Sequence, residues 1–346
     1  MRIALDATYS IGANLSGVGV YSREILAGLA AAHREASYLF CYRPHRFLRS
    51  FREPLPPNAH RRLLGEHWIP RSDLYHGLNQ RLPTACPRRT VATFHDLFVI
   101  TGEYSTPEFR ARFEEQAREA AAHADLVIAV SEFTAGQVEH CLGVERSRIR
   151  VIHHGVRPPR KDAASGIARE PVVLHVGALQ KRKNIVRLVR AFESLGPEWR
   201  LVLAGSAGFG ADEALHAIQA SPARDRIELP GYVSDLELDQ WYARASIFAF
   251  PSLDEGFGMP VLDAMARGVP VLTSNGSALR EVSGQAALQV DPQDEEEIAV
   301  RLREMAGSEE LRNELSNRGR RHAASFSWEA AVSRTWAVYS ELLPKS

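Results

Sequence analysis

Short apolar runs alternate with longer amphipathic stretches along both halves of this chain, and this alternation limits the fold more than any other feature. Short apolar runs suit strands that are buried on both faces of a sheet, and apolar residues at helical spacing suit the helices that cover it. The strand candidates of the first half are Ile3–Ala7, Tyr38–Tyr42, Leu74–His76, Val91–Phe94, Leu126–Val130 and Ile149–Ile152. Those of the second half are Val172–Val176, Arg200–Ala204, Arg226–Leu229, Ile247–Phe250, Val269–Thr273 and Leu288–Val290.

Stretches with helical spacing separate these strands. They are Tyr21–Ala32, Pro107–Ala122, Ile185–Phe192, Leu236–Ala243, Pro260–Ala266 and Glu295–Met305. Strands that alternate with helices predict an α/β protein with doubly wound parallel sheets. Ligands of such sheets bind outside the carboxyl ends of the strands, so the loops that follow the strands are the first place to look for a site.

A polar stretch with proline and glycine, 157–166, interrupts the pattern near the middle of the chain and suits a linker. We therefore expect two tandem domains, 1–160 and 170–327. A last helical stretch, 328–343, is long enough to cross back over the first domain. A length of 346 residues agrees with two domains.

The bulk composition describes an ordinary globular protein, with 45% hydrophobic and 24% charged residues. Its three cysteines, Cys41, Cys86 and Cys141, form no CxxC pair, which favours a reducing compartment. The amino terminus has no signal-peptide pattern, and no uncharged apolar run is long enough to span a bilayer. We therefore expect a cytoplasmic protein, at most peripheral to a membrane.

The strongest local charge bias lies in residues 43–62, where six arginines face one acidic residue, Glu53. These arginines are Arg43, Arg46, Arg49, Arg52, Arg61 and Arg62. A solvated loop or helix face explains them, and an anionic acceptor or a membrane surface is the sharper interpretation. Nucleic acid is not an expected partner, because the bias is local and lacks interleaved aromatic residues.

Gly17 and Gly19 follow the first strand candidate and precede a predicted helix. Glycine lets a diphosphate approach the backbone at the amino end of a helix, where the dipole favours anions. The third glycine of the dinucleotide-binding fingerprint would fall at Ser22, so that pattern is incomplete. A tight turn without a ligand explains the same residues.

His95 follows the strand candidate Val91–Phe94. A histidine at a strand end can donate a hydrogen bond to a ligand or take part in proton transfer. The alternative is a buried histidine whose ring is satisfied by its neighbours, and the sequence leaves both interpretations open.

Three consecutive cations, Lys181, Arg182 and Lys183, follow Gly177 and precede the predicted helix 185–192. Cations at the amino end of a helix are unfavourable by about 0.3–1 kcal/mol each. A bound anion would account for them, and an arginine fork beside a lysine point charge suits a diphosphate. A solvated basic turn is the alternative.

The segment 251–263 joins a strand end to a helix. Its run Gly256–Met259 offers backbone N–H groups, and Pro260 suits the first position of the helix that carries Asp263. The carboxylates of Glu255 and Asp263 can accept hydrogen bonds from the vicinal hydroxyls of a ribose or hexose. The chain contains no Asp-x-Asp pair, so we expect no divalent metal site.

Together these motifs resemble the retaining glycosyltransferases of the GT-B fold, specifically glycosyltransferase family 4 (GT4) and its bacterial polysaccharide mannosyltransferases. The similar segments are Ser16–Tyr21, His95–Leu97, Val130–Glu132, Val176–Asn184, Gly231–Asp235 and Glu255–Ala264. They follow one another in the family's order and span most of the chain. The resemblance implies two Rossmann-like domains that face each other across a cleft, the first for an acceptor and the second for a nucleotide sugar.

The implied activity is metal-independent transfer of a hexose with retention, from a nucleotide sugar as substrate and with no cofactor. GDP-mannose is the first donor that the resemblance implies, and UDP-glucose or a related UDP-hexose is the second. The implied acceptor is a saccharide or a lipid-linked saccharide, so residues 43–62 are a candidate for peripheral membrane contact.

The resemblance also implies roles for residues. Arg182 and Lys183 would neutralise the diphosphate, Glu255 would hold the sugar, and His95 would contact the transferred sugar. The remaining donor-binding residues would be Gly17, Gly19, Gly177, Tyr232, Val233, Gly256, Phe257, Gly258, Met259 and Asp263. Among these, Asp263 would bind the ribose hydroxyls, and Tyr232 and Val233 would lie beside the base.

This chain departs from the family pattern at three places. Asp263 stands where the family usually has glutamate, His153-His154-Gly155 where an Asn-Gly turn is common, and Ala178 near a position where many relatives have arginine. The shorter side chain of Asp263 puts its ribose contact in question.

Other classes of protein fit less well. A nucleotide-sugar epimerase would need its own acid and base carboxylates, a phosphorylase a lysine that binds pyridoxal phosphate, and a dehydrogenase the complete fingerprint at Gly17–Ser22. A catalytically silent sugar-nucleotide-binding partner in a polysaccharide assembly complex stays open, although Glu255, Arg182, Lys183 and His95 are all present.

Overall fold

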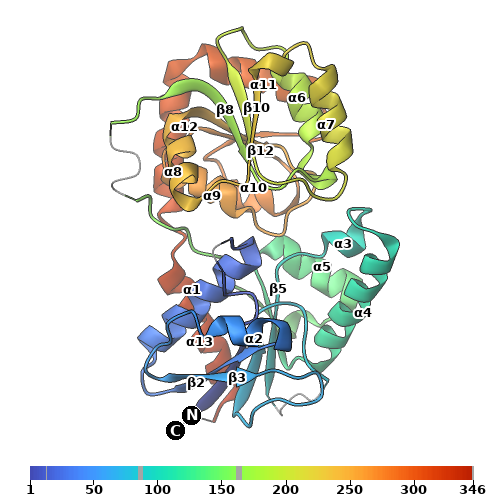
Figure 1. Ribbon diagram of the computed structural model, residues 1–346, viewed down its shortest axis with the longest axis vertical. Helices are drawn as coiled ribbons and strands as arrows, with labels where there is room; N and C mark the ends of the chain where they lie inside the picture. Colours follow the sequence, from blue (N-terminus) through green and yellow to red (C-terminus); the bar gives the residue numbers. More distant parts are fainter. Residues whose placement is uncertain (13, 85–88, 161–165, 345–346) are drawn as a thin grey trace. The chain divides into compact units, whose positions relative to one another are not determined.

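The computed structural model describes residues 1–12, 14–84, 89–160 and 166–344. The chain divides into two compact units, each built on one sheet (Figure 1). Unit 1 comprises Met1–Thr101, Thr106–Gly155 and Ser327–Ser346, and unit 2 comprises Gly102–Ser105 and Val156–Phe326. Residues 161–165 of the expected linker and Cys86 lie outside the described ranges.

Unit 1 contains a seven-stranded sheet in the order β3-β2-β1-β4-β5-β6-β7, and all its neighbouring strands are parallel. The strands are β1 Arg2–Asp6, β2 Ser37–Tyr42, β3 Ala59–Leu63, β4 Leu74–Gly77, β5 Thr90–Phe94, β6 Leu126–Ala129 and β7 Ile149–Val151. The helices are α1 Gly17–Ala32, α2 Pro44–Ser50, α3 Phe98–Thr101, α4 Pro107–His123, α5 Glu132–Leu142 and α13 Trp328–Leu342. The strand order reverses between β1 and β4.

The last helix, α13, belongs to unit 1 and packs against α1 (Figure 1). The two helices approach closely at Gly28, where an added Cβ would lie 2.4 Å from Cγ2 of Val332. The rings of His33 and Trp336 stack with centroids 3.6 Å apart. The chain therefore returns to its first unit at its end.

Unit 2 contains a six-stranded parallel sheet in the order β10-β9-β8-β11-β12-β13. Its strands are β8 Glu170–Val176, β9 Arg200–Ala204, β10 Ile227–Gly231, β11 Ala245–Phe250, β12 Val271–Ser274 and β13 Leu288–Val290. Its helices are α6 Ile185–Phe192, α7 Ala211–Ala220, α8 Asp235–Arg244, α9 Met259–Ala266, α10 Ser277–Ser283, α11 Glu295–Gly307 and α12 Glu309–Ala323. This is the 3-2-1-4-5-6 strand order of the complete Rossmann fold, and the order reverses between β8 and β11.

The buried central strands explain why the alternation could be seen in the sequence. Val172, Val173 and Leu174 of β8 are fully buried, because helices cover both faces of the parallel sheet. The expected α/β class with doubly wound sheets is confirmed. Among the described residues, no helix combines the length and the apolar character needed to cross a bilayer.

Residues 43–62 contain one helix and one edge strand. The helix α2, Pro44–Ser50, with its exposed Arg49 agrees with the solvated helix face that the sequence offered, whereas the edge strand β3, Ala59–Leu63, was not predicted. An edge strand keeps one side in solvent, so the polar sequence of β3 carried no apolar signal. Helices α3, α5, α7, α10 and α12 were not predicted, and α9 begins at Met259, which puts Pro260 at its second position.

Candidate functional site

The loops after β8 and β11 meet where the strand order of unit 2 reverses. The N–H of Leu253 donates to the carbonyl oxygen of Arg182 over 2.7 Å. Nδ2 of Asn184 donates to the carbonyl oxygens of Pro251 at 3.0 Å and Pro292 at 2.6 Å, which ties in the segment after β13. Doubly wound sheets bind ligands at this reversal, so these loops form the candidate site.

Arg182, Lys183 and Glu255 form a buried ionic cluster in these loops. Nη1 of Arg182 lies 2.7 Å from Oε1 of Glu255, and Nζ of Lys183 lies 2.5 Å from the same oxygen. Nη1 of Arg182 also donates to the carbonyl oxygen of Asp254 over 3.1 Å. Two cations and one carboxylate leave a net positive charge, which suits a ligand with more than one negative charge.

Burial on its own would raise the pKa of Glu255, because a buried carboxylate loses hydration. The charges of Arg182 and Lys183 and their hydrogen bonds outweigh burial and hold the pKa of Glu255 at about 2. Glu255 is therefore ionised at neutral pH. It can accept hydrogen bonds from hydroxyl groups, and it cannot serve as a proton donor there.

Lys183 rests on aromatic side chains of the sheet. Its Nζ lies 4.4 Å from the ring centroid of Phe250, and that ring stacks on His175 at 5.2 Å. Nδ1 of His175 donates to the carbonyl oxygen of Ala249 over 3.0 Å. Burial and the nearby Lys183 charge lower the pKa of His175 to about 4. The sequence interpretation missed His175, and its signal was a histidine inside the apolar run Val172–Val176.

Gly177 brings the backbone close to this cluster. Its φ of +147° is in a region that favours glycine, and a Cβ there would lie 3.5 Å from Cε of Lys183. The neighbouring loop comes closer still, since a Cβ on Gly205 would lie 2.0 Å from the carbonyl oxygen of Gly177. The predicted position of Gly177 beside the cations is thus found in the structure.

Gly256–Met259 connects Glu255 to the amino end of α9. Gly258 precedes the helix with φ +97°, and a Cβ there would lie 2.5 Å from Cδ2 of Leu279. The ring of Phe257 is buried and meets Phe326 edge-on at 6.1 Å, so only its backbone could reach a ligand. The positive end of the α9 dipole therefore begins four residues after Glu255.

Asp263 points to a different partner. Its Oδ1 lies 3.3 Å from Nη1 of Arg267, and its side chain is 32% exposed. Arg267 also binds Asp239, with Nη2 2.6 Å from Oδ1. The Asp263 carboxylate thus pairs with Arg267 in the structure. This pairing and the short side chain both set Asp263 apart from Glu255 as a ligand for the donor.

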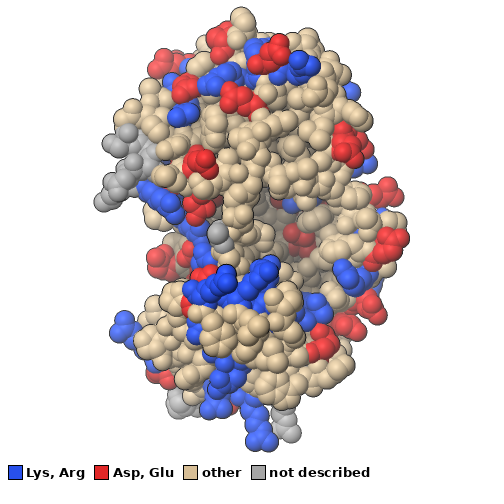
Figure 2. All heavy atoms as spheres, in the orientation of Figure 1, with Lys and Arg blue, Asp and Glu red and all other residues tan. Residues whose placement is uncertain are grey.

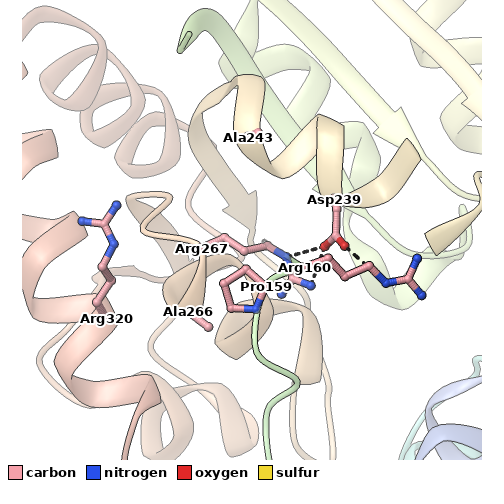
Figure 3. A pocket seen from close by; sticks show the side chains of 7 residues that line it. All are labelled: Pro159, Arg160, Asp239, Ala243, Ala266, Arg267 and Arg320. Atoms are coloured by element: carbon pink, nitrogen blue, oxygen red, sulfur yellow. Dashed lines mark hydrogen bonds and ion pairs between the residues drawn. The ribbon is translucent and has the colours of Figure 1, made fainter. Parts of the chain in front are cut away.

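Arg267 also lines a pocket of about 230 Å³ at the carboxyl end of α9. Figure 3 shows Asp239 between Arg267 and Arg160, joined to both, with Arg320 standing apart from these three side chains. The lining residues are Pro159, Arg160, Asp239, Ala243, Ala266, Arg267 and Arg320. None of them belongs to the loops that carry the ionic cluster.

Tyr232 and Val233 occupy the loop between β10 and α8. Tyr232 is exposed. Ser234 then caps α8 reciprocally with Glu237, which fixes where the loop ends. An exposed tyrosine on a loop at a carboxyl strand end offers a flat surface to a base, as the resemblance implies.

His95 lies in unit 1 after β5. Its Nε2 is 2.9 Å from the carbonyl oxygen of Leu78, which can only accept, so this nitrogen carries the proton. Burial lowers the pKa of His95 to about 4, although the Leu78 hydrogen bond raises it. The ring is therefore neutral at pH 7 and its Nδ1 is an acceptor. The sequence left open a ligand contact and a buried histidine satisfied by its neighbours; the structure shows a buried ring with Nε2 bonded to Leu78, and Nδ1 is the nitrogen that can accept from a ligand.

The His95 ring packs between two other rings. It meets Tyr21 edge-on at 4.7 Å and stacks with His154 at 5.5 Å. The Tyr21 hydroxyl is 2.9 Å from Oγ1 of Thr93, which is 2.8 Å from Nε2 of His76. These contacts hold the His95 ring in one orientation through α1, β4 and β5.

Gly17 and Gly19 begin α1 in unit 1. Gly17 is exposed at the first helical position, and Ser16 caps the helix by accepting from the N–H of Gly19 at 3.4 Å. Gly19 is buried, and a Cβ there would lie 2.8 Å from the carbonyl oxygen of Tyr9. Packing against Tyr9 thus requires Gly19 to be glycine, whereas Gly17 is exposed at the start of the helix.

The structure brings together, within unit 2, most of the residues predicted for the donor. Gly177, Arg182, Lys183, Glu255 and Gly256–Met259 lie in adjoining loops. Among residues 1–12, 14–84, 89–160 and 166–344, no group of three or more His, Cys, Asp or Glu side chains is arranged to hold a metal ion.

Residues 15–160 match the description Glycosyltransferase Family 4, and residues 159–322 match Glycosyl transferases group 1. O-antigen chain mannosyltransferase B from Escherichia coli is 31% identical to this chain over 97% of the chain and 99% of its own length. The chain belongs to glycosyltransferase family 4. It is a transferase enzyme of the mannosyltransferase-like branch of GT4.

Further similarities agree with this assignment to GT4. The serotype-specific mannosyltransferase WbdA from Escherichia coli is 27% identical over 75% of this chain, which spans about a third (34%) of that relative. Sucrose-phosphate synthase from Thermosynechococcus elongatus superposes with a TM-score of 0.78 at 23% identity, covering 99% of this chain and 98% of its own. Two Rossmann-like units with this structural similarity confirm the GT-B fold.

Proposed function

We propose that this GT4 enzyme transfers a hexose, with mannose favoured, from a nucleotide diphosphate sugar to a saccharide or lipid-linked saccharide. We propose that it does so with retention and without a metal ion. The buried cluster of Arg182, Lys183 and Glu255 carries this proposal. It offers two cations for a diphosphate and one carboxylate for sugar hydroxyls, beside the amino end of α9.

In the proposed reaction, the bond between C1 of the sugar and the diphosphate oxygen breaks, and its electron pair stays on that oxygen. The acceptor hydroxyl oxygen bonds to C1 on the same face of the ring, and its proton passes to the departing diphosphate. Arg182 and Lys183 would stabilise the negative charge that develops on the leaving oxygen. A preorganised contact of this kind contributes roughly 2.7–4 kcal/mol.

Other groups of the site would position the donor. Glu255 would accept hydrogen bonds from its hydroxyls, since its low pKa keeps it ionised. His95 would accept one at Nδ1, because its Nε2 proton is used on Leu78. Tyr232 would stack on the base, and Asp263 would reach the ribose only if it turned from Arg267.

GDP-mannose is the donor we propose first, because the full-length relative is named a mannosyltransferase. UDP-glucose or a related UDP-hexose is the second donor. We place the reaction in the cytoplasm, at a membrane surface if the acceptor is lipid-linked.

Isothermal titration of the full chain with GDP, UDP, GDP-mannose and UDP-glucose tests the donor. Failure of every nucleotide to bind at millimolar concentration would overturn the proposal. Slow hydrolysis of labelled donor in the absence of acceptor separates an enzyme from a catalytically silent binding partner, which would protect its ligand.

A further inference from the structure

The helix α2 and the turn after it expose large apolar side chains. Leu48 is 80% exposed and Phe51 is 61% exposed. The adjoining strand β3 and its following loop add Leu63 at 41% and Trp68 at 56%, and α2 packs against β3. Single exposed apolar residues are ordinary, but several on adjoining elements indicate a surface that is covered in use.

This exposure is built into the local structure. Arg61 of β3 donates from Nε to the carbonyl oxygen of Ser50 over 3.0 Å and from Nη2 to that of Glu53. Its guanidinium lies 5.1 Å from the ring centroid of Phe51, and Phe47 meets that ring edge-on at 5.5 Å. The end of α2 is thus tied to the sheet while Leu48 and Phe51 remain outside.

Cations surround these apolar side chains. Arg49, Arg52 and Arg62 are exposed. Within the described part of the chain, the guanidinium groups of Arg46, Arg49 and Arg52 form no ion pair or hydrogen bond. Figure 2 shows basic side chains gathered on the part of unit 1 that carries α2.

The single acidic residue of the segment does not neutralise this surface. Oε1 of Glu53 accepts from the N–H of Gly12 at 3.2 Å and lies 4.0 Å from Nη2 of Arg23. Its charge is therefore directed to the loop after β1, and the arginines of α2 keep their net positive charge.

We propose that α2, the turn Phe51–Glu53, β3 and Trp68 form a docking surface for an anionic lipid bilayer. Leu48 and Phe51 would enter the boundary between headgroups and acyl chains, and Trp68 would lie at headgroup level. Arg49, Arg52 and Arg62 would bind lipid phosphates, which the planar guanidinium group matches. Cations around an apolar centre complement an anionic membrane, which attracts each basic residue near its surface.

This inference goes beyond the donor chemistry and can fail without it. The docking surface would bring a lipid-linked acceptor to the enzyme. The proposal rests on the proposed function only for the identity of that acceptor.

Cosedimentation of the full chain with vesicles tests the proposal. We expect binding to phosphatidylcholine vesicles that contain about a third phosphatidylglycerol, and weak binding to pure phosphatidylcholine. Raising the salt from about 0.1 M to about 0.5 M should reduce binding, because it screens the arginines. Equal binding to both vesicle types, or no binding to either, would overturn the proposal.

Surface variants distinguish docking through these residues from non-specific adsorption to vesicles. L48S with F51S, and separately R49Q with R52Q, should each weaken vesicle binding about tenfold or more. The matched control is L229S with V300S, two side chains that are each 43% exposed in unit 2, and it should bind as the wild type does. Wild-type binding by both surface variants would overturn the proposal.

A protein partner is the competing outcome. If L48S with F51S abolished a concentration-dependent self-association seen by light scattering, and vesicles did not bind, the surface would be a protein interface. All variants should retain donor binding by titration, so a loss of vesicle binding is distinguishable from failure of the donor site or of folding.

Discussion

The ammonium nitrogen of Lys183 lies 2.5 Å from Oε1 of Glu255, and the two side chains are only 8% and 10% exposed. The residues are 72 positions apart in the chain and come from loops after β8 and β11. Without a ligand, Glu255 holds both cations in place. A diphosphate would find them already desolvated and oriented, which is the preorganisation that electrostatic catalysis needs.

Loss of the Glu255 charge should impair both activity and folding. Glu255→Gln or Glu255→Ala should lower transfer at least about a hundredfold and destabilise the chain by about 3–5 kcal/mol, because two buried cations lose their partner. Initial rates and chemical denaturation measure the two effects. Asp263→Asn is the comparison, and we expect it to be milder because Asp263 is partly exposed and pairs with Arg267. Wild-type rates in Glu255→Ala would place the sugar elsewhere.

Lys183 should matter far more than its neighbour Lys181. Lys183→Ala should cut transfer about a hundredfold, since it removes a contact of roughly 2.7–4 kcal/mol to the leaving group. Lys181→Ala removes the same charge from an exposed position and should leave the rate within about twofold. If the two variants lost activity equally, general electrostatic attraction would explain both losses and the specific contact would be wrong.

Buried neutral histidines should make the fold sensitive to acid. The pKa of His175 falls from 6.5 to about 4 on folding, so the unfolded chain takes up its proton first. The stability that this group contributes is complete above pH 6.5 and is lost as the pH falls to 4, on the order of 2–3 kcal/mol. His175→Gln should show a smaller loss between pH 7 and pH 4 in urea denaturation. An unchanged pH dependence would contradict the shift.

Chelation should have little effect on transfer. Arg182 and Lys183 supply the positive charge that a divalent ion would otherwise bring to the diphosphate. We expect rates with EDTA within about twofold of those without it, with added Mg²⁺ as the control. Strong inhibition by EDTA that Mg²⁺ reverses would show that a metal takes part.

The close approach of the loops at Gly177 and Gly205 should make any side chain at Gly205 unfavourable. Gly205→Ala would put Cβ 2.0 Å from the carbonyl oxygen of Gly177 and displace the backbone beside Lys183. We expect a loss of about 1–3 kcal/mol in stability and weaker donor binding. Gly136→Ala in α5 meets no atom within 4 Å and should be neutral or stabilising. Equal melting temperatures for the two variants would argue against the close approach.

The sequence by itself determined the fold class and the loops of interest. Apolar periodicity is a local consequence of burial, so every strand except β3 could be predicted to within one or two residues, and β9 and β13 without error. The cations Arg182 and Lys183 and the segment Glu255–Met259 stood out because they follow buried strands. Edge strand β3 was not predicted, because its exposed side needs no apolar residue.

Only the tertiary structure decided which side chains meet. The pairing of Lys183 with Glu255, the use of the His95 proton on Leu78 and the packing of α13 on α1 all join parts of the chain that are not neighbours in sequence. No local pattern encodes such contacts, because they depend on strand order. The order reverses between β8 and β11, and that reversal is what brings the cations and the carboxylate together.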